Sequence, residues 1–257
     1  MTAPSVAIII PARYGSTRLP AKPLIKFGGK PMIQHVWERA KRARLAGQVI
    51  VATDDKRIAD VVRSFGGECV LTPEEARSGS DRIAMVAKEM TGTEIIVNVQ
   101  GDEPLIVPRM IDEAAELLLN DPQIRVGTLI RKIENPEEAV NPSVVKVVTD
   151  SGQFAVYFSR SPIPHFRDGT DGHPPARPAY FKHVGIYAYR REFLLEFASW
   201  PPSKLEEIEQ LEQLRIIDRG IRIKTRVTNF ESIPVDTAED VDKVRTLLRE
   251  QQSVQAE

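Results

Sequence analysis

The sequence predicts an α/β protein with a mixed, mostly parallel sheet flanked by helices. Short runs of β-branched residues alternate with amphipathic stretches along the chain, as in strand-helix-strand units. The run VAIII at 6–10 is continuously apolar, which indicates a buried strand. A length of 257 residues suits one α/β domain with an embellishment. We therefore expect a single domain over 1–257, a hairpin and loop insertion at about 150–215, and a frayed tail at 250–257.

The expected elements follow from these patterns in chain order. Strands are expected at 5–10, 48–52, 94–99, 125–131, 144–149, 154–158, 183–189 and 221–227. Helices are expected at 31–44, 55–65, 80–90, 108–119, 191–199, 204–219 and 238–250. Pro31 suits a first helical turn, Ser80 is expected to cap a helix, and Gly220 is expected to end one in the left-handed conformation.

The middle of the chain departs from this alternation. The stretch VVKVVTDSGQFAVYF contains two β runs around Asp150-Ser151-Gly152, which predicts an antiparallel hairpin. Segment 159–180 has many prolines and no periodicity, so we expect a long ordered loop or a mobile cover. The hairpin and the apolar stretch 183–197 together suggest a surface for pairing with a second copy of the chain.

Composition excludes several classes of function. Lys plus Arg number 35 and Asp plus Glu 36, so no overall positive field attracts nucleic acid or an anionic membrane. Cys69 is the only cysteine, which excludes an intrachain disulfide and a thiolate metal cage and suits a reducing compartment. The first ten residues have neither a basic region nor an apolar run long enough for a signal peptide or a spanning helix. We expect a cytoplasmic protein without membrane insertion.

Several familiar catalytic motifs are missing. The sequence contains no G-x-x-x-x-G-K-[ST] and no G-x-G-x-x-G, so neither a P-loop nor a dinucleotide fingerprint is available. It also lacks H-E-x-x-H and G-x-S-x-G, which argues against a zinc hydrolase and against a nucleophilic serine.

The loop PARYGSTRLPAKPL at 11–24 directly follows the first strand. Ligands of open α/β sheets bind beyond the carboxyl ends of the strands, where this loop must lie. Arg13, Arg18 and Lys22 supply positive charge, and small residues allow backbone N–H groups to approach a ligand. A phosphate site fits both features, while a solvated basic loop is an equally ordinary explanation.

The stretch VNVQGDEPLI at 97–106 places Asp102 after another apolar strand, at the same edge of the sheet. A carboxylate that faces bound phosphates repels them unless a cation lies between, so a divalent metal is the natural inference. Mg²⁺ suits such a site because it takes one or two carboxylates and completes its shell with water and phosphate oxygens. An exposed Asp-Glu turn is the simpler alternative.

Two further motifs remain open at this level. Asp236 in IPVDTAEDV either belongs to a helix start that Thr237 caps together with Asp240, or turns toward Asp102 as a second metal ligand. In RSGSDR at 77–82, hydroxyl groups either bind a base or ribose edge or simply begin a helix.

The motifs taken together closely resemble the 3-deoxy-manno-octulosonate (Kdo) cytidylyltransferase family, the CMP-Kdo synthetases of lipopolysaccharide assembly. The resemblance covers about 6–248 and is carried, in order, by IIIPARYGSTRLPAKPL, VATDD, SGSDR, NVQGDEPLI, NPSVVKVVTD, YFSRSPIPHFRD, KHVGIYAYR, LEQLR and VDTAEDV. It implies a Rossmann-like nucleotidyltransferase fold with a small sugar-binding and dimerisation subdomain, and a homodimer. It also implies the Mg²⁺-dependent reaction of CTP with Kdo to give CMP-Kdo and pyrophosphate.

The resemblance also implies roles for individual residues. Arg13 and Lys22 would hold the triphosphate with Arg18 nearby, and Asp102 and Asp236 would ligate Mg²⁺. The residues expected close to nucleotide and sugar are Ser78, Arg82 and Gln100. The residues expected to contact the sugar acid are Arg160, Arg167, His183, Tyr187, Glu212 and Gln213.

The chain departs from the family at a few positions. Ala21 stands where the family often has Gly, Arg77 where it often has Gln, and Glu207 where some relatives have His. The last two bear on substrate preference, because some relatives use an 8-amino analogue of Kdo. The remaining alternatives are a cytidylyltransferase for another sugar acid, such as a nonulosonic acid, and a non-catalytic sugar-nucleotide binding protein.

Overall fold

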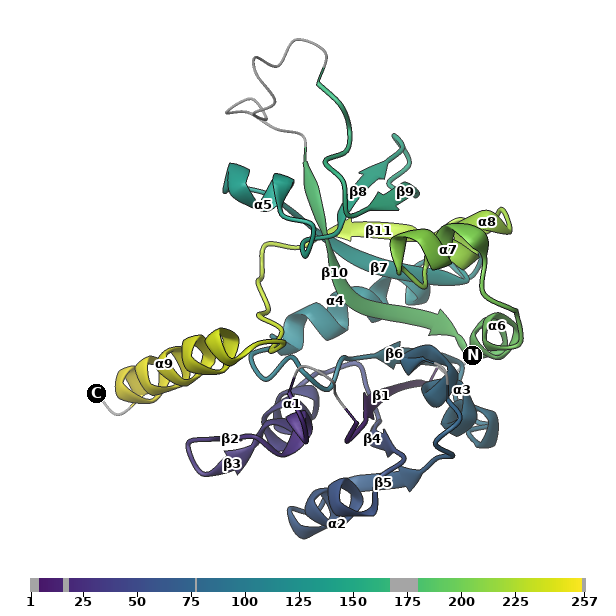
Figure 1. The fold of residues 1–257 in the computed structure, drawn as a ribbon. Coiled ribbons are helices and arrows are strands. Elements are labelled where there is room, and N and C mark those ends of the chain that lie inside the picture. The colour runs from purple at the N-terminus through teal and green to yellow at the C-terminus, as the bar shows by residue number, and fades with distance from the viewer. Residues whose placement is uncertain (1–4, 16–18, 77, 167–179, 256–257) are drawn as a thin grey trace.

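The computed structural model describes residues 5–15, 19–76, 78–166 and 180–255 (Figure 1). Its strands are β1 (Val6–Ala12), β2 (Lys26–Phe27), β3 (Lys30–Pro31), β4 (Gln48–Thr53), β5 (Glu68–Leu71), β6 (Ile95–Asn98), β7 (Val126–Lys132), β8 (Lys146–Thr149), β9 (Ala155–Ser159), β10 (Phe181–Arg190) and β11 (Lys224–Val227). Its helices are α1 (Met32–Ala40), α2 (Lys56–Ser64), α3 (Gly79–Glu89), α4 (Pro108–Leu119), α5 (Pro136–Val140), α6 (Arg191–Ala198), α7 (Lys204–Glu209), α8 (Leu214–Asp218) and α9 (Ala238–Gln255), with a 3-10 turn η1 (Lys22–Leu24).

The main sheet has the order β11-β7-β10-β6-β1-β4-β5, with β8 and β9 attached through β10. Strands β6, β1, β4 and β5 run parallel, and β11 runs parallel to β7. Strand β10 is antiparallel to β6 and β7 and joins these two parallel groups. The predicted α/β class with a mixed, mostly parallel sheet is therefore confirmed.

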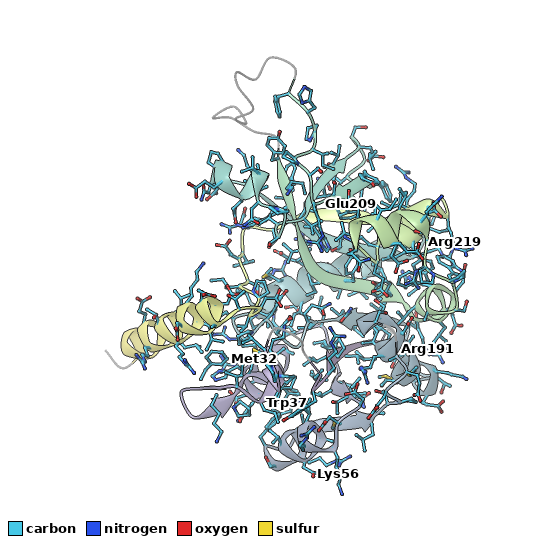
Figure 2. All side chains as sticks on the ribbon, viewed as in Figure 1. Met32, Trp37, Lys56, Arg191, Glu209 and Arg219 are labelled. Atoms are coloured by element: carbon cyan, nitrogen blue, oxygen red, sulfur yellow. The ribbon has the colours of Figure 1, made fainter. Side chains whose placement is uncertain are left out.

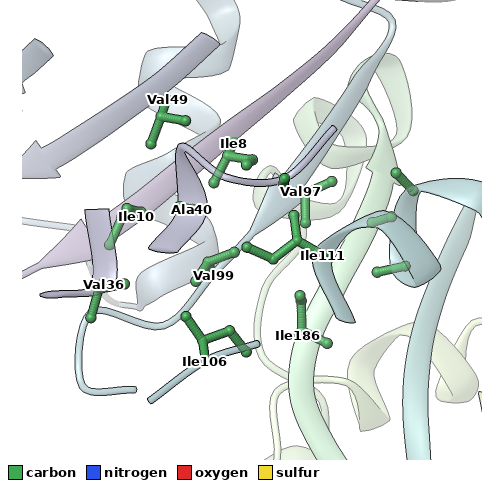
Figure 3. Packing of buried hydrophobic residues seen from close by; sticks show 14 of the residues in the cluster. Ile8, Ile10, Val36, Ala40, Val49, Val97, Val99, Ile106, Ile111 and Ile186 are labelled. Atoms are coloured by element: carbon green, nitrogen blue, oxygen red, sulfur yellow. The ribbon is translucent and has the colours of Figure 1, made fainter. Parts of the chain in front are cut away.

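Helices cover both faces of this sheet. On one face, side chains of α1, α2 and α4 pack with Ile8 and Ile10. Figure 3 shows Val36 and Ala40 of α1 and Ile111 of α4 in this cluster. On the other face, side chains of α3, α6 and α8 pack with Ala7 and Ile9. Alternate residues of β1 thus enter different cores, which explains why this strand is a continuous apolar run.

Most expected elements are present, and the differences have local causes. Strand β5 was not predicted; its side chains are half-buried or exposed, so it lacks a strong apolar pattern. The pair β2–β3 also escaped prediction because each strand has only two residues, joined by Gly28 and Gly29 at positive φ. The single helix expected at 204–219 is instead α7 and α8, because Gln210 adopts φ 53° and ends α7. Gly220 has φ 72°, as predicted.

Two expected helix starts are wrong in detail. Ser78, rather than Ser80, caps α3, since its hydroxyl accepts a hydrogen bond from the N–H of Asp81. Pro31 lies one residue before α1 as its cap and also pairs in β3. At the other end of the chain, α9 continues to Gln255, beyond the expected end at 250; fraying of the tail stays a prediction.

The predicted hairpin is present as β8 and β9, which pair antiparallel. The stretch 183–197 does not offer the expected pairing surface, because most of its apolar side chains, including Ile186, Tyr189, Phe193 and Phe197, are buried in the chain's own core. Residues 167–179, most of the segment predicted as a loop or cover, lie outside the described part of the chain. Within the described ranges, no helix combines the length and apolarity that crossing a bilayer requires.

Candidate active site

The candidate site lies where the adjacent parallel strands β1 and β6 end. Their carboxyl ends point the same way, which brings the loop after β1 beside the turn 100–102 after β6. The backbones approach so closely that a Cβ on Gly101 would lie 2.6 Å from the carbonyl oxygen of Pro11. Glycine is therefore required at this position of QGDEP.

An open cavity of about 430 Å³ occupies this edge and is called the edge cavity below. Its walls include the predicted site residues Arg13, Lys22, Ser78, Arg82, Gln100, Asp102 and Asp236. They come from four separate regions of the sequence, which the fold gathers around one space. Arg18, the remaining cation of the first loop, lies outside the described residues.

Lys22 forms ion pairs with both carboxylates of this cavity. Its Nζ lies 2.7 Å from Oδ2 of Asp102 and 3.1 Å from Oδ1 of Asp236. Burial opposes a charge on Lys22, but the charges and hydrogen bonds of the two carboxylates outweigh it and raise the pKa of the ammonium group. Asp102 and Asp236 thus converge on a single cationic group, although they are far apart in the sequence.

Two features bring Asp236 to this position. The N–H of Val235 donates to the carbonyl of Asp102 (2.9 Å), and Val235 packs with side chains of α9, Phe27 and Met32. The capping box is also formed: Thr237 N–H donates to Oδ2 of Asp240 (2.9 Å), and Asp240 N–H donates to the Thr237 hydroxyl (3.3 Å). The two alternatives for this motif are therefore compatible, because the helix start itself directs Asp236 toward Asp102.

The loop that carries Lys22 holds an unusual backbone conformation. Ala21 has φ 55° and ψ 28°, in the left-handed region, and its N–H donates to the carbonyl of Tyr14 (3.2 Å). A residue with a Cβ is strained there, whereas glycine is not. Ala21 thus holds a conformation that favours glycine, the residue that the resemblance implies for this position.

A carboxylate and two hydroxyl groups join the first turn of α3 to the residues before α8. Ser78 donates to Oε1 of Glu212, and Ser80 donates to Oε2 of the same carboxylate (2.7 Å). Burial raises the pKa of Glu212, an effect that these two hydrogen bonds and the nearby Arg215 partly offset. Ser78 lines the edge cavity and Ser80 the neighbouring one, so Glu212 fixes the wall between them.

Arg82 is held by partners that the sequence did not reveal. It is 4% exposed, and its guanidinium donates to Asp54, at the end of β4, and to Thr72. Asp54 follows β4, which is parallel to β1, so the sequence could have predicted that Asp54 lies at this edge of the sheet. It could not have predicted the contact with Arg82. Arg82 therefore borders the edge cavity from a fixed position.

A smaller cavity of about 170 Å³, called the inner cavity below, adjoins the edge cavity through Gln100, which lines both. The residues expected to contact a sugar that lie here are Gln100, His183, Tyr187, Glu212 and Gln213. Gln100 donates to the carbonyl of Gly185 (3.2 Å). Most of the residues predicted to bind the nucleotide therefore line the edge cavity, and most of those predicted to contact the sugar line the adjoining inner cavity.

His183 is uncharged at neutral pH. Desolvation lowers its pKa to about 3. Thr128 donates its hydroxyl hydrogen to the carbonyl of Ile186 (2.7 Å), so the Thr128 oxygen accepts the contact from Nε2 of His183 (3.1 Å). The neutral ring therefore carries its proton on Nε2. At the cavity wall, His183 is thus a hydrogen-bonding group without charge.

Arg160, one of the expected sugar contacts, is not brought into the inner cavity. Arg160 lines neither cavity; its guanidinium donates to the carbonyl oxygens of Glu209 (2.9 Å) and Pro142 (3.0 Å). Glu209, labelled in Figure 2, also accepts hydrogen bonds from Ser159 and from the N–H of Arg160. Arg167 lies outside the described residues, so its predicted role is untested.

Comparison with known proteins agrees with this geometry. A family model described as cytidylyltransferase matches residues 7–223. The 3-deoxy-manno-octulosonate cytidylyltransferase of Geobacter sulfurreducens is 52% identical over 95% of this chain and 100% of its own length. The protein of the same name from Trichlorobacter lovleyi is 49% identical over 95% of this chain and 99% of its own.

A solved structure described as CMP:2-keto-3-deoxy-manno-octonic acid synthetase complexed with CTP superposes with a TM-score of 0.88. It is 44% identical and covers 96% of this chain and 99% of its own. The matches with these relatives and with this structure extend over nearly the whole sequence. The chain therefore belongs to the cytidylyltransferase family.

Proposed function

We propose that this protein is a Mg²⁺-dependent cytidylyltransferase that converts CTP and Kdo to CMP-Kdo and pyrophosphate. The observation that carries the proposal is the convergence of Asp102 and Asp236 on Lys22 in the edge cavity, which adjoins a polar inner cavity. Relatives with about half of their residues identical carry the name of this activity, and a similar solved structure is described with CTP.

The edge cavity suits the triphosphate of CTP. Arg13 and Lys22 supply positive charge there, and the close approach of Gly101 to the end of β1 leaves backbone rather than side chain at the floor. Arg18 is expected to add a further cation. These groups bind and orient the phosphates, so that the α-phosphorus faces the inner cavity beyond Gln100.

Asp102 and Asp236 would hold Mg²⁺. The fit is supported by the ammonium group already found between their oxygens, which marks a position where both carboxylates reach one cation. No cluster of three or more His, Cys, Asp or Glu side chains suited to a metal occurs in the described part of the chain. A two-carboxylate site suits Mg²⁺, which completes its shell with water and phosphate oxygens. When bound, the ion would neutralise charge on the phosphates.

The inner cavity would orient the sugar acid. Gln100, Tyr187 and Gln213 provide amide and hydroxyl groups, and neutral His183 adds a hydrogen-bonding group without charge. Such groups match the hydroxyls of a sugar. Arg160 and Arg167 are the expected partners of the sugar carboxylate, and Arg160 has to leave its carbonyl partners to serve in that way.

Transfer then needs alignment rather than a covalent intermediate. The anomeric oxygen of Kdo forms a bond to the α-phosphorus, and the bond from this phosphorus to the oxygen that bridges to the β-phosphorus breaks, releasing pyrophosphate. The attacking hydroxyl releases its proton to the solvent. Burial raises the pKa of the Cys69 thiol to about 11, and Cys69 belongs to β5, so a thiolate nucleophile is not involved. Positioning and charge stabilisation are what such transfers require.

The test is a coupled assay for pyrophosphate with CTP, MgCl₂ and a panel of sugar acids, followed by identification of the product. We expect pyrophosphate release to be faster with Kdo than with the other acids, and the product to be CMP-Kdo. The panel includes 8-amino-Kdo and a nonulosonic acid. Glu207, one position that raised the 8-amino alternative, is exposed on α7 and lines neither cavity, so the panel has to decide between the two acids. Turnover with another acid alone would refute the sugar assignment, and no turnover with any acid would favour a binding protein.

We also propose that the protein is a cytoplasmic homodimer that serves lipopolysaccharide assembly. The exposed apolar side chains of Val156 on β9 and Ile208 on α7 support a pairing surface near the hairpin. Light scattering on the purified protein tests the dimer, since a monomer mass at working concentrations would exclude it. Fractionation of cells tests the compartment.

A further inference from the structure

One polar side chain in the inner cavity has no role in the function proposed above. Asn98, the last residue of β6, is 2% exposed and lines this cavity. Its Oδ1 has no hydrogen-bond partner among the residues that the structure describes. It pairs across the sheet with Tyr187, which is expected to contact the sugar.

An asparagine at this position is costly without a partner. A buried amide oxygen that loses its hydrogen bond to water and gains none destabilises the folded chain. Ile96, two residues earlier on the same face of β6, is fully buried in the apolar core, so an apolar residue at 98 would simply extend that core. The amide is therefore better explained by a group that enters the cavity than by packing.

The chemistry of the cavity specifies that group. An amide oxygen accepts hydrogen bonds and repels a carboxylate, so its partner carries a donor such as a hydroxyl. Gln213, 7% exposed, lines the same cavity with an Nε2 donor that likewise has no partner within the described ranges. An acceptor and a donor that both lack partners suit a polyhydroxylated ligand, whose hydroxyls both donate and accept.

We propose that Asn98 is a sugar-binding residue that selects the acceptor by accepting a hydrogen bond from one of its hydroxyl groups. This inference rests on the proposed function, since it assigns Asn98 to the sugar acid of that reaction. A site built to bind a hydroxyl discriminates against an analogue that lacks it, because the buried acceptor is then left unpaired.

The experiment compares the wild-type protein with Asn98→Leu, Asn98→Asp and the control Ile96→Val, a conservative change on the same face of β6. Each protein is assayed for pyrophosphate release with Kdo and with analogues that each lack one hydroxyl, and its KM for CTP and melting temperature are measured. We expect Asn98→Leu to lower kcat/KM for Kdo about 10- to 100-fold at unchanged KM for CTP. For the wild type, one analogue should have a much lower kcat/KM than Kdo. For Asn98→Leu, the same analogue and Kdo should have similar kcat/KM values. Asn98→Asp retains an acceptor and should retain that discrimination.

The outcomes separate the two proposals. Loss of rate with every analogue in equal proportion, or a matching rise in KM for CTP, would assign Asn98 a structural role and overturn the inference. Wild-type rates in Asn98→Leu would overturn it as well. If Asn98→Leu does not fold, loss of discrimination in Asn98→Asp overturns it, and retained discrimination supports it. Absence of turnover by the wild type with any sugar acid would refute the proposed function and this inference together, whereas turnover that does not depend on Asn98 refutes the inference alone.

Discussion

Replacing Lys22 by methionine tests whether its ammonium group holds the place of a cation between Asp102 and Asp236. Methionine keeps an unbranched side chain, shorter by the nitrogen atom, and leaves two carboxylates without their shared partner. Lys22 is 15% exposed, while Asp102 and Asp236 are 29% and 38% exposed, so solvent screens both ion pairs. We therefore assign each ion pair a contribution of about 1 kcal/mol to the free energy of unfolding, which is less than a charged hydrogen bond contributes in a site without water. The expected loss of stability is then about 2 kcal/mol, or a fall in melting temperature of about 4–8 °C.

The assay is thermal unfolding with and without saturating MgCl₂, with Lys26→Met as the control because Lys26 is exposed on β2. In Lys22→Met the carboxylates are free to bind the ion, so Mg²⁺ should raise the melting temperature of this variant more than that of the wild type. Ligands that bind only the folded state stabilise it in this way. An unchanged melting temperature, or the same response to Mg²⁺ in all three proteins, would refute the reasoning.

The other predictions concern charge, backbone strain and acid stability. Asp102→Asn and Asp236→Asn should each lower pyrophosphate release at least about 100-fold without lowering the melting temperature by more than Lys22→Met does; a near-normal rate would remove that residue from the metal site. Ala21→Gly should raise the free energy of unfolding by about 0.5–1 kcal/mol, measured in urea, because relief of the φ 55° conformation exceeds the entropy that glycine adds to the unfolded chain. His183 binds a proton below about pH 6.5 when unfolded but only near pH 3 when folded, so stability falls as the pH falls through this window. His183→Gln should remove at most about 1.4 kcal/mol per pH unit of that dependence, and parallel stability curves would contradict the assignment.

Much of the fold was predictable because the buried strands carry strong patterns. Strands β1, β4 and β6 lie between two helical layers, so they are apolar on both faces and visible in the sequence. Strand β5 lies at the end of the sheet, where exposure weakens the pattern. The break between α7 and α8 depends on a left-handed Gln210, a residue type that gives no warning of such a conformation.

The candidate site was predictable in its residue types and less so in its contacts. The position of a loop after a parallel strand is fixed by topology, which is why Arg13, Lys22 and Asp102 were named correctly as neighbours of one edge. The approach of Asp236 depends on the packing of α9, which the local sequence does not specify. For Arg160 the resemblance predicted a contact with the sugar acid, whereas in the structure its guanidinium donates to backbone carbonyl oxygens of Glu209 and Pro142.

Asp236 is made late by the ribosome, after every strand of the sheet. A growing chain can already fold the loop that carries Lys22 and the turn that carries Asp102, whereas α9 and the backbone bond from Val235 to Asp102 form only when the last segment has emerged. If Asp236 holds the metal ion as proposed, the site is complete only when translation is nearly finished. A cut by a protease between β11 and Val235 would leave Asp236 in place only through non-covalent contacts, the backbone bond from Val235 to Asp102 and the packing of α9.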